Sequence, residues 1–414
     1  MHHMNKYPSL IIVALLFGLQ AYSQSSNLTG SPYSLFGLGV ESNSGTGRNS
    51  GLGSTGISLD ASYGINLYNP AAFATLKENE ITFDFGGSAE LNNLIGDDIS
   101  EQRTTYNFTN ISLAFNHNND YGIGLTLKPA TTVGYSLIGI ENNIEGSSEQ
   151  FTTNIGGNGG ISELRLDYAR TVFENLNVGL KASYLFGKIE ESESIVTSSS
   201  YLEINETNYY SGAQLGIGLQ YNLLDKHNFG FTVDFPTVLK GTKDVVVGKY
   251  SNAAYTTLEE TEDESIDSFY LPLKLGFGYN TKFKNLLLTA DYKKNFWGTT
   301  NQSDAIGNYT DQNIFGLGAS YAVDPTSYKL WKRVDFRMGL NYNSGYLKVD
   351  DTNIDTYSAS FGVGLPIGKR SLLNISYTLG KKGTTESILI KEYVNTLNIN
   401  ISLSDLWFQK RKFN

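Results

Sequence analysis

The stretch Gln214-Leu-Gly-Ile-Gly-Leu-Gln-Tyr221 decides the fold, because its residues alternate in character along the chain. Leu215, Ile217, Leu219 and Tyr221 form one apolar set, and the residues between them are glutamine or glycine. Successive side chains of a β-strand point to opposite faces of a sheet. The stretch therefore predicts a strand with one apolar face and one polar face.

The same alternation recurs along most of the chain and predicts about 14 strands, an even number of the kind found in bacterial single-chain barrels. The predicted strands are 79–89, 105–116, 120–141, 158–172, 176–187, 205–223, 227–239, 267–281, 284–297, 310–323, 333–348, 355–366, 371–381 and 392–404. A two-sheet sandwich would show the same alternation, so the period alone does not separate the two folds.

Two further patterns favour a transmembrane antiparallel β-barrel. The apolar faces end repeatedly on tyrosine, a residue that favours the boundary between lipid and water. These tyrosines are Tyr168, Tyr184, Tyr221, Tyr279, Tyr292, Tyr321, Tyr342 and Tyr377. In addition, long connections, such as 188–204 and 240–266, alternate with short ones, such as 117–119 and 224–226. Outer-membrane barrels have short periplasmic turns and longer external loops, which predicts that both termini lie in the periplasm.

Composition excludes several other classes. The 414 residues carry a net charge of −10 and no cysteine, which argues against a nucleic-acid-binding surface, a disulfide framework and a thiol nucleophile. Beyond the N-terminal 23 residues only His117 and His227 remain, both on predicted turns, and no metal-ligand spacing occurs. We therefore expect neither an enzyme nor a bound cofactor or metal.

The N-terminus predicts a secretory signal peptide over residues 1–23. Lys6 is followed by the apolar run Leu10–Leu19, and then by Ala21 and Ser23, small residues at the −3 and −1 positions of a cleavage site. The run is too short to span a bilayer, which takes about 20 residues, although an N-terminal anchor helix is the alternative. Residues 79–408 would then form the barrel and residues 409–414 a basic periplasmic tail, either solvated or a docking site for a partner.

Residues 24–78 precede the first strand and do not alternate. They are rich in Gly, Ser and Asn, as in a disordered tail, but Leu52, Ile57, Leu67 and Phe73 are more apolar than a solvated tail requires. A 14-strand barrel is also too wide for its own side chains to fill. These residues therefore predict a plug inside the lumen.

At this point the chain resembles a known family. The segment Tyr68-Asn-Pro-Ala-Ala-Phe-Ala74, with its Asn69, Pro70 and Ala71, is similar to the Asn-Pro-Ala element in the hatch of FadL-type outer-membrane transporters. Residues 31–37 and 51–60 look like the hatch of FadL-related proteins of Bacteroidota. The resemblance implies a channel for long-chain fatty acids or aromatic hydrocarbons, closed by a hatch, with a side opening at a kink in the third strand.

The third predicted strand carries Pro129 in its middle, and proline cannot donate to a strand ladder. An ordinary bulge would explain it, and so would an opening between the third and fourth strands. Gly122, Gly124 and Gly134 would give room there for a ligand or for a hatch segment.

A group of charged residues, Glu163, Arg165, Asp167 and Arg170 with Lys181 on the next strand, should face the lumen, because charge is costly on a lipid-facing surface. Their mixed signs favour anchoring of the hatch over selection of a solute.

Two functions follow from these patterns. The first is a FadL-like, porin-like outer-membrane channel for passive uptake of hydrophobic small molecules. The second is a non-transporting accessory or structural barrel of a multi-protein outer-membrane assembly or secretion complex, with 188–204 and 240–266 as docking surfaces. Outer-membrane lipid is a partner in either case.

Overall fold

A computed structural model describes residues 28–42, 45, 47–61, 64–96, 100–117, 121–143, 150–196, 201–224, 226–251, 254–304, 306–324, 327–368, 371–386 and 388–406. The predicted signal peptide, residues 1–23, and the predicted basic tail, residues 409–414, lie outside these residues. Within them, no helix is long and apolar enough to cross a membrane.

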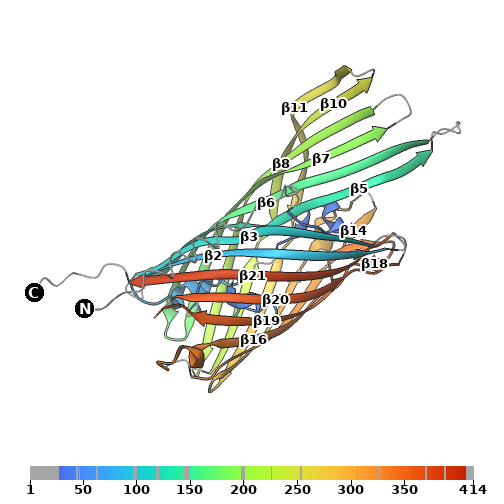
Figure 1. Ribbon diagram of the computed structural model, residues 1–414. Helices are drawn as coiled ribbons and strands as arrows, with labels where there is room; N and C mark the ends of the chain where they lie inside the picture. The colour runs from blue at the N-terminus through green and yellow to red at the C-terminus, as the bar shows by residue number, and fades with distance from the viewer. Residues whose placement is uncertain are drawn as a thin grey trace, which may run out of the picture.

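The chain forms a closed antiparallel barrel of 14 strands (Figure 1). Its wall consists of β2 (Glu80–Ile95), β3 (Ser100–His117), β4 (Tyr121–Pro129), β5 (Thr131–Asn143), β6 (Gln150–Phe173), β7 (Leu176–Val196), β8 (Tyr201–Leu223), β9 (His227–Asp234), β10 (Thr237–Ser251), β11 (Ala254–Leu271), β12 (Lys274–Phe283), β13 (Leu286–Asn295), β15 (Gln312–Ala322), β16 (Asp335–Asn343), β19 (Thr356–Pro366), β20 (Leu372–Lys382) and β21 (Lys391–Leu406). β2 pairs with β21, which closes the ring.

Three of the 14 strands are interrupted, each at a proline. Pro129 ends β4 before β5, Pro236 separates β9 from β10, and Pro272 separates β11 from β12. Proline removes a ladder hydrogen bond, so each interruption changes the neighbour of the strand. β9 pairs with β8 and β12, whereas β10 pairs with β8 and β11.

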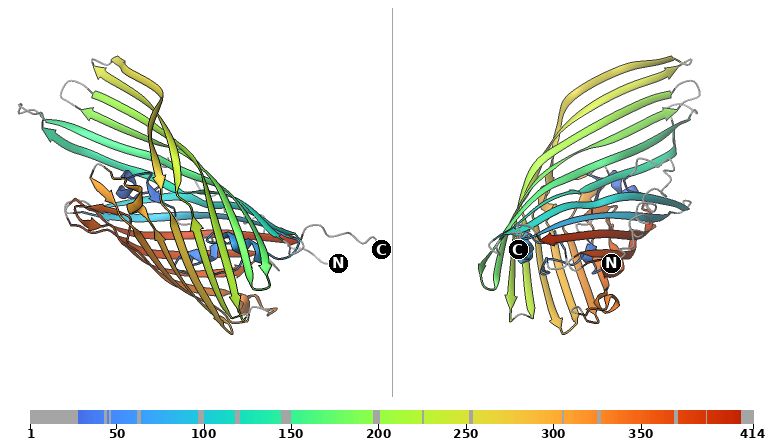
Figure 2. Two further views of the ribbon diagram at one scale, coloured as in Figure 1. Left: turned by 180° about the vertical axis from the view of Figure 1, so that it is seen from behind. Right: turned by 60° about the vertical axis from the view of Figure 1, so that its left-hand side comes forward.

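We call the direction away from the short turns 'above'. Above these interruptions, β5, β6, β7, β8, β10 and β11 continue as one sheet that extends beyond the shorter strands (Figures 1 and 2). The prediction that 188–204 and 240–266 are loops is therefore wrong. β10 and β11 pair along almost their full length, from Thr237↔Leu271 to Ser251↔Ala254. The hairpins extend past the lipid-facing region, where alternation of apolar residues is no longer required.

Short elements complete the structure. The N-terminal segment (residues 28–78) contains the 3-10 helices η1 (Pro32–Leu35) and η2 (Pro70–Thr75), the short strand β1 (Val40–Glu41) and one helical turn, α2 (Gly47–Ser50). At the barrel end away from the short turns lie η3 (Trp297–Thr300) and a small sheet of β14 (Gly307–Tyr309), β17 (Leu347–Val349) and β18 (Thr352–Asn353). At the opposite end lies η4 (Leu330–Arg333).

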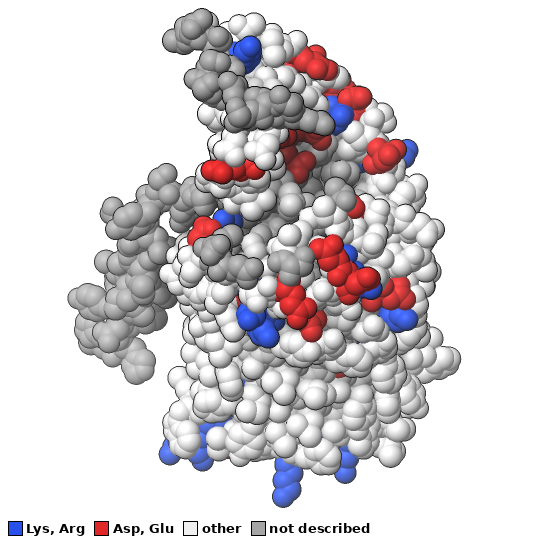
Figure 3. All heavy atoms as spheres, turned by 90° about the vertical axis from the view of Figure 1, so that its right-hand side faces the viewer, with Lys and Arg blue, Asp and Glu red and all other residues white. Residues whose placement is uncertain are grey.

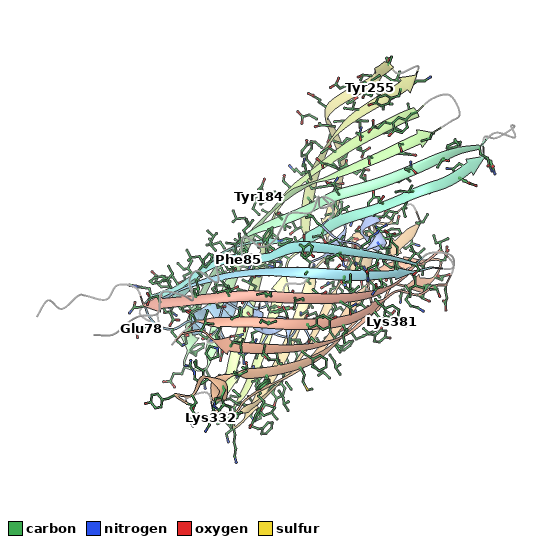
Figure 4. The ribbon with its side chains drawn as sticks, in the orientation of Figure 1. Glu78, Phe85, Tyr184, Tyr255, Lys332 and Lys381 are labelled. Carbon is green, nitrogen blue, oxygen red and sulfur yellow. The ribbon has the colours of Figure 1, made fainter. Side chains whose placement is uncertain are left out.

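The wall is polar inside and apolar outside. On β6 the inward residues Arg165 and Asp167 are buried, and the outward residues Leu164, Leu166 and Tyr168 are exposed. Phe85 on β2 and Tyr184 on β7 project outward from the wall (Figure 4). A belt of exposed apolar side chains around a closed wall is the arrangement of a membrane-spanning barrel.

The tyrosines that end the apolar faces lie at both ends of the wall. Tyr321 lies near the short turns, opposite Phe336, whereas Tyr292 pairs with Phe315 toward the other end. Because neighbouring strands run in opposite directions, tyrosines at the ends of successive strands supply two girdles, one at each surface of the bilayer.

Replacement of Leu166 by Arg places a cation on the lipid-facing surface, and we expect it to lower the free energy of unfolding by about 2–4 kcal/mol. Leu166→Arg would be compared with Leu258→Arg, since Leu258 is similarly exposed but lies on β11 above the closed ring. Denaturant titration of the barrel in vesicles measures both variants. Equal losses would contradict the placement of the lipid-facing belt.

Candidate functional site

The inner face of the wall carries glycines where the N-terminal segment touches it. Four of them, Gly122, Gly124, Gly179 and Gly218, form a glycine patch on β4, β7 and β8. A Cβ added to Gly122 would lie 1.9 Å from the carbonyl oxygen of Phe73, and one added to Gly218 would lie 2.0 Å from Oδ1 of Asn69. Only glycine permits so close an approach.

The Asn69-Pro70-Ala71 element lies against this glycine patch. The side chain of Asn69 is completely buried; its amide donates to the carbonyl oxygens of Ile57 at 2.8 Å and of Leu219 on β8 at 2.9 Å. Its Oδ1 accepts from the backbone N–H of Ala71 at 2.9 Å and so caps η2. Asn69 thus joins two parts of the N-terminal segment to the wall.

Polar wall residues bind the backbone of the same segment on other sides. Asp291 on β13 accepts from the N–H groups of Gly56 and Ile57, at 2.7 and 3.0 Å. Gln220 on β8 donates to the carbonyl oxygens of Ile57 and Leu59, at 3.0 and 2.9 Å. The N-terminal segment has little regular secondary structure, so its buried N–H and carbonyl groups need hydrogen-bond partners from elsewhere. These wall side chains supply them.

The predicted lumen charges are partly brought together. Arg165 forms an ion pair with Asp167 at 2.6 Å and donates to the carbonyl oxygen of Leu67 in the N-terminal segment at 2.7 Å. Glu163 pairs with Lys128 at 3.1 Å, and Lys181 pairs with Asp234 at 2.6 Å. Among the hydrogen bonds of the described residues, those of this charged set reach the N-terminal segment only through Arg165.

Arg170 does not face the lumen, so that prediction is wrong. Residues two apart share a face of a strand, and Arg170 has the parity of Leu164, Leu166 and Tyr168, which are exposed on the outer surface. Its partner in the ladder is Tyr121, the first residue of β4, so its charge lies at the short-turn end of the wall.

Above the glycine patch, two cavities lie inside the barrel. One, of about 400 Å³, is lined by charged groups that include Lys128, Glu163 and Lys274. Lys274 forms an ion pair with Glu41 of β1 at 2.6 Å. Lys293 donates to the carbonyl oxygen of Ser54 at 3.2 Å and lies 3.9 Å from the ring centre of Tyr68.

Lys274 and Lys293 therefore take their partners from the N-terminal segment. Burial raises the pKa of the Tyr68 hydroxyl well above its ordinary value. The face of this phenol ring lies against the Lys293 ammonium, which is a cation–π contact.

The second cavity, of about 350 Å³, reaches a place where the wall is not paired. The ladder between β3 and β4 ends at Ile111↔Leu127, and no ladder joins β3 to β5 among the described residues. Asn107, Phe108 and Thr109 on β3 line this cavity together with Pro129 and Thr132.

The position of Pro129 explains the end of the ladder. Ala130 donates to the carbonyl oxygen of Ile161 on β6 at 2.7 Å. Since neighbouring residues of a strand direct their N–H groups to opposite sides, the nitrogen of Pro129, which has no hydrogen, faces β3.

A side-chain hydrogen bond crosses the space between β3 and β5, in which Arg103 on β3 donates to the carbonyl oxygen of Ser136 on β5 at 3.1 Å. Asn107 on β3 donates to the carbonyl oxygen of Leu28 in the N-terminal segment. β1 pairs with β5 through Val40↔Thr132 and Glu41↔Thr131. The N-terminal segment therefore borders the unpaired part of the wall.

The predicted glycines of the side opening lie in different places. Gly122 and Gly124 contact Phe73 and belong to the glycine patch below the second cavity, so they hold the N-terminal segment. Gly134 donates its N–H to the hydroxyl of Ser34 at 3.1 Å. Sequence reasoning missed Gly179, Gly218, Gln220 and Asp291, whose partners lie far away along the chain.

No group of three or more His, Cys, Asp or Glu suitable for a metal occurs within the described ranges. His227 forms a hydrogen bond of 2.7 Å with the hydroxyl of Tyr279, and His117 packs near the ring of Tyr121. Both histidines lie near the short turns.

The sequence model of the BamG family matches residues 4–414, which is nearly the whole chain. The chain belongs to the BamG family. Among curated protein sequences, none matches it. The assignment to a branch in Bacteroidota stays a prediction.

Solved structures with a similar fold include FadL-type channels. The P. putida toluene transporter TodX has a TM-score of 0.61 at 14% identity, and 89% of this chain covers 100% of that one. A Pseudomonas aeruginosa FadL homologue has a TM-score of 0.60 at 13% identity, with coverage of 89% and 100%. The CymD monoaromatic hydrocarbon channel has a TM-score of 0.56 at 16% identity, and 89% of this chain covers 99% of that one. The fold of this BamG-family chain is therefore that of FadL-type barrels.

We expect Gly218→Ala to displace the Asn69-Pro70 turn, because the new methyl group would overlap Asn69 Oδ1. The cost should be about 1–3 kcal/mol, as for other overpacked sites. Limited proteolysis would then cut the N-terminal segment faster, while the folded barrel persists on an unheated gel. Gly380→Ala is the matched control, since its nearest neighbour would be 3.5 Å away; equal cleavage in the two variants would argue against the contact.

Proposed function

We propose that this BamG-family barrel is an outer-membrane channel for passive uptake of hydrophobic solutes, in which the N-terminal segment is the hatch. The observation that carries the proposal is the second cavity, because it joins the lumen to the unpaired part of the wall between β3 and β5. A solute in this cavity would leave sideways, past Phe108 and Pro129, into the bilayer.

The hatch would close the direct route along the barrel axis. Residues 52–59 and 67–73 are bound to wall residues on several strands, from Gly122 on β4 to Asp291 on β13. A solute would therefore need either displacement of these contacts or a side exit. The side exit requires less disruption, since the β3–β5 space is crossed by a side chain, Arg103, and not by a ladder.

The similar structures support this class of solute, since one is a toluene transporter and another is a monoaromatic hydrocarbon channel. The outer-membrane location and the periplasmic position of both termini belong to the same proposal. They are supported by the apolar outer belt and by the contrast between short turns at one end and long hairpins at the other.

Cross-linking across the side exit tests the proposed route. The chain has no cysteine, so Arg103→Cys/Ser136→Cys introduces the only thiols, and a short bis-maleimide would join β3 to β5. We expect the cross-link to reduce uptake of toluene and of a long-chain fatty acid to the level of cells without the protein, because the side exit would be closed.

The control pair is Ser194→Cys/Glu203→Cys, which cross-links β7 to β8 at positions that already pair. This cross-link should leave uptake unchanged. Unchanged uptake after the Arg103→Cys/Ser136→Cys cross-link would rule out the side exit. If the chain with free thiols transports neither solute, the channel proposal itself is wrong.

A further inference from the structure

The short-turn end of the barrel has one turn unlike its neighbours. The connection between β15 and β16, residues 323–334, contains η4 and is longer than the 284–285 and 367–371 connections on either side of it. The carbonyl oxygen of Lys332 accepts from the N–H of Asp324 at 2.8 Å, and the Lys332 N–H donates to Lys329 at 3.1 Å. Arg333 donates to the carbonyl oxygen of Gly368 in the next turn at 3.3 Å.

The 323–334 turn exposes large apolar side chains. Tyr328 is fully exposed, and Leu330 and Trp331 are 60% and 62% exposed; η4 buries no residue. Such side chains are unfavourable in water, whereas tryptophan and tyrosine favour the headgroup region of a bilayer. The lipid-facing residues Tyr321 and Phe336 lie at the ends of the two strands that this turn joins, so the turn continues the apolar belt.

Cations lie on the same turn as these apolar side chains and on the turns that follow along the barrel edge. We call Lys226, Lys282, Lys284, Lys329, Lys332 and Arg333 the basic rim. Lys282 lies at the end of β12, and the other five lie on three successive turns of the barrel edge. The N–H of Lys282 donates to the carbonyl oxygen of Lys226 at 3.1 Å, which joins two of these turns. One carboxylate, Asp324, lies at the base of the 323–334 turn.

The two ends of the molecule differ in charge. In Figure 3 the acidic groups gather over the upper part and basic groups lie along the lower edge. Figure 4 shows Lys332 at this lower edge, pointing away from the barrel, with Tyr255 at the opposite extreme.

We infer that the 323–334 turn and the basic rim form a binding surface for anionic phospholipid headgroups of the adjacent leaflet. Trp331 and Leu330 insert beside the acyl chains, and Lys329, Lys332 and Arg333 contact the phosphates. Continuity with the lipid-facing belt selects lipid as the occupant, and the positive charge selects an anionic headgroup. The inference does not depend on what passes through the barrel.

Quenching of Trp331 fluorescence by brominated lipid tests this inference. In a Trp297→Phe/Trp407→Phe background, Trp331 is the one remaining tryptophan. The protein would be placed in vesicles of phosphatidylethanolamine and phosphatidylglycerol at fixed composition, with bromine on the chains of one lipid or of the other. We expect brominated phosphatidylglycerol to quench more strongly than brominated phosphatidylethanolamine. The difference should correspond to an enrichment of phosphatidylglycerol around Trp331 of about fivefold over the bulk bilayer, and higher salt should reduce it.

The substitutions Lys329→Gln, Lys332→Gln and Arg333→Gln together should make the two brominated lipids equal quenchers. The matched control, Lys240→Gln/Lys243→Gln/Lys249→Gln on β10, removes the same charge at the other end and should leave the preference intact. Gel mobility without heating verifies that each variant is folded.

Equal quenching in the parent protein would overturn the anionic preference. No quenching by either lipid would overturn membrane insertion of the turn and indicate contact with water or with an acidic protein.

Discussion

A wall of 14 strands encloses more space than its own inward side chains can fill, and the rest of this structure follows from that constraint. The chain fills the space with its own N-terminal residues. The glycine patch permits this filling, because the absence of side chains at Gly122, Gly124, Gly179 and Gly218 lets backbone approach backbone. The polar residues around the patch then satisfy the N–H and carbonyl groups of a segment without regular structure.

The same N-terminal residues join three apolar clusters along the barrel. Phe73 and Leu67 pack near the short turns. Leu38 packs against β5, β6, β7 and β10, and Tyr33 and Phe36 pack with Trp297 at the end of the barrel away from the short turns. A single segment thus links the closed ring to the structure above it. Glu41 of the same segment also forms an ion pair with Lys274 on β12.

Much of the wall could be predicted because a membrane barrel imposes a period of two on each strand. The strands expected at 176–187 and 205–223 begin and end, at the short-turn end, where β7 and β8 do. At their other ends the expected strands stop short of β7 and β8, because outside the lipid the outer face no longer needs apolar residues. Pro236 and Pro272 carried the same signal as Pro129 and mark the other two interruptions.

The site was less predictable than the wall. The Asn69-Pro70-Ala71 element was visible as a motif, but its partners come from strands that are far apart in sequence and meet only when the barrel closes. Arg170 was assigned to the lumen although its parity with Leu166 places it outside. Asp291 looks like any inward carboxylate, and no local pattern reveals that it accepts from Gly56 and Ile57.

Ion conductance in a planar bilayer tests most directly whether the N-terminal segment closes the lumen. The full chain should show little conductance, and deletion of residues 45–76 should open a large, steady pore. If the full chain conducts as well as the deletion variant, the N-terminal segment does not close the barrel.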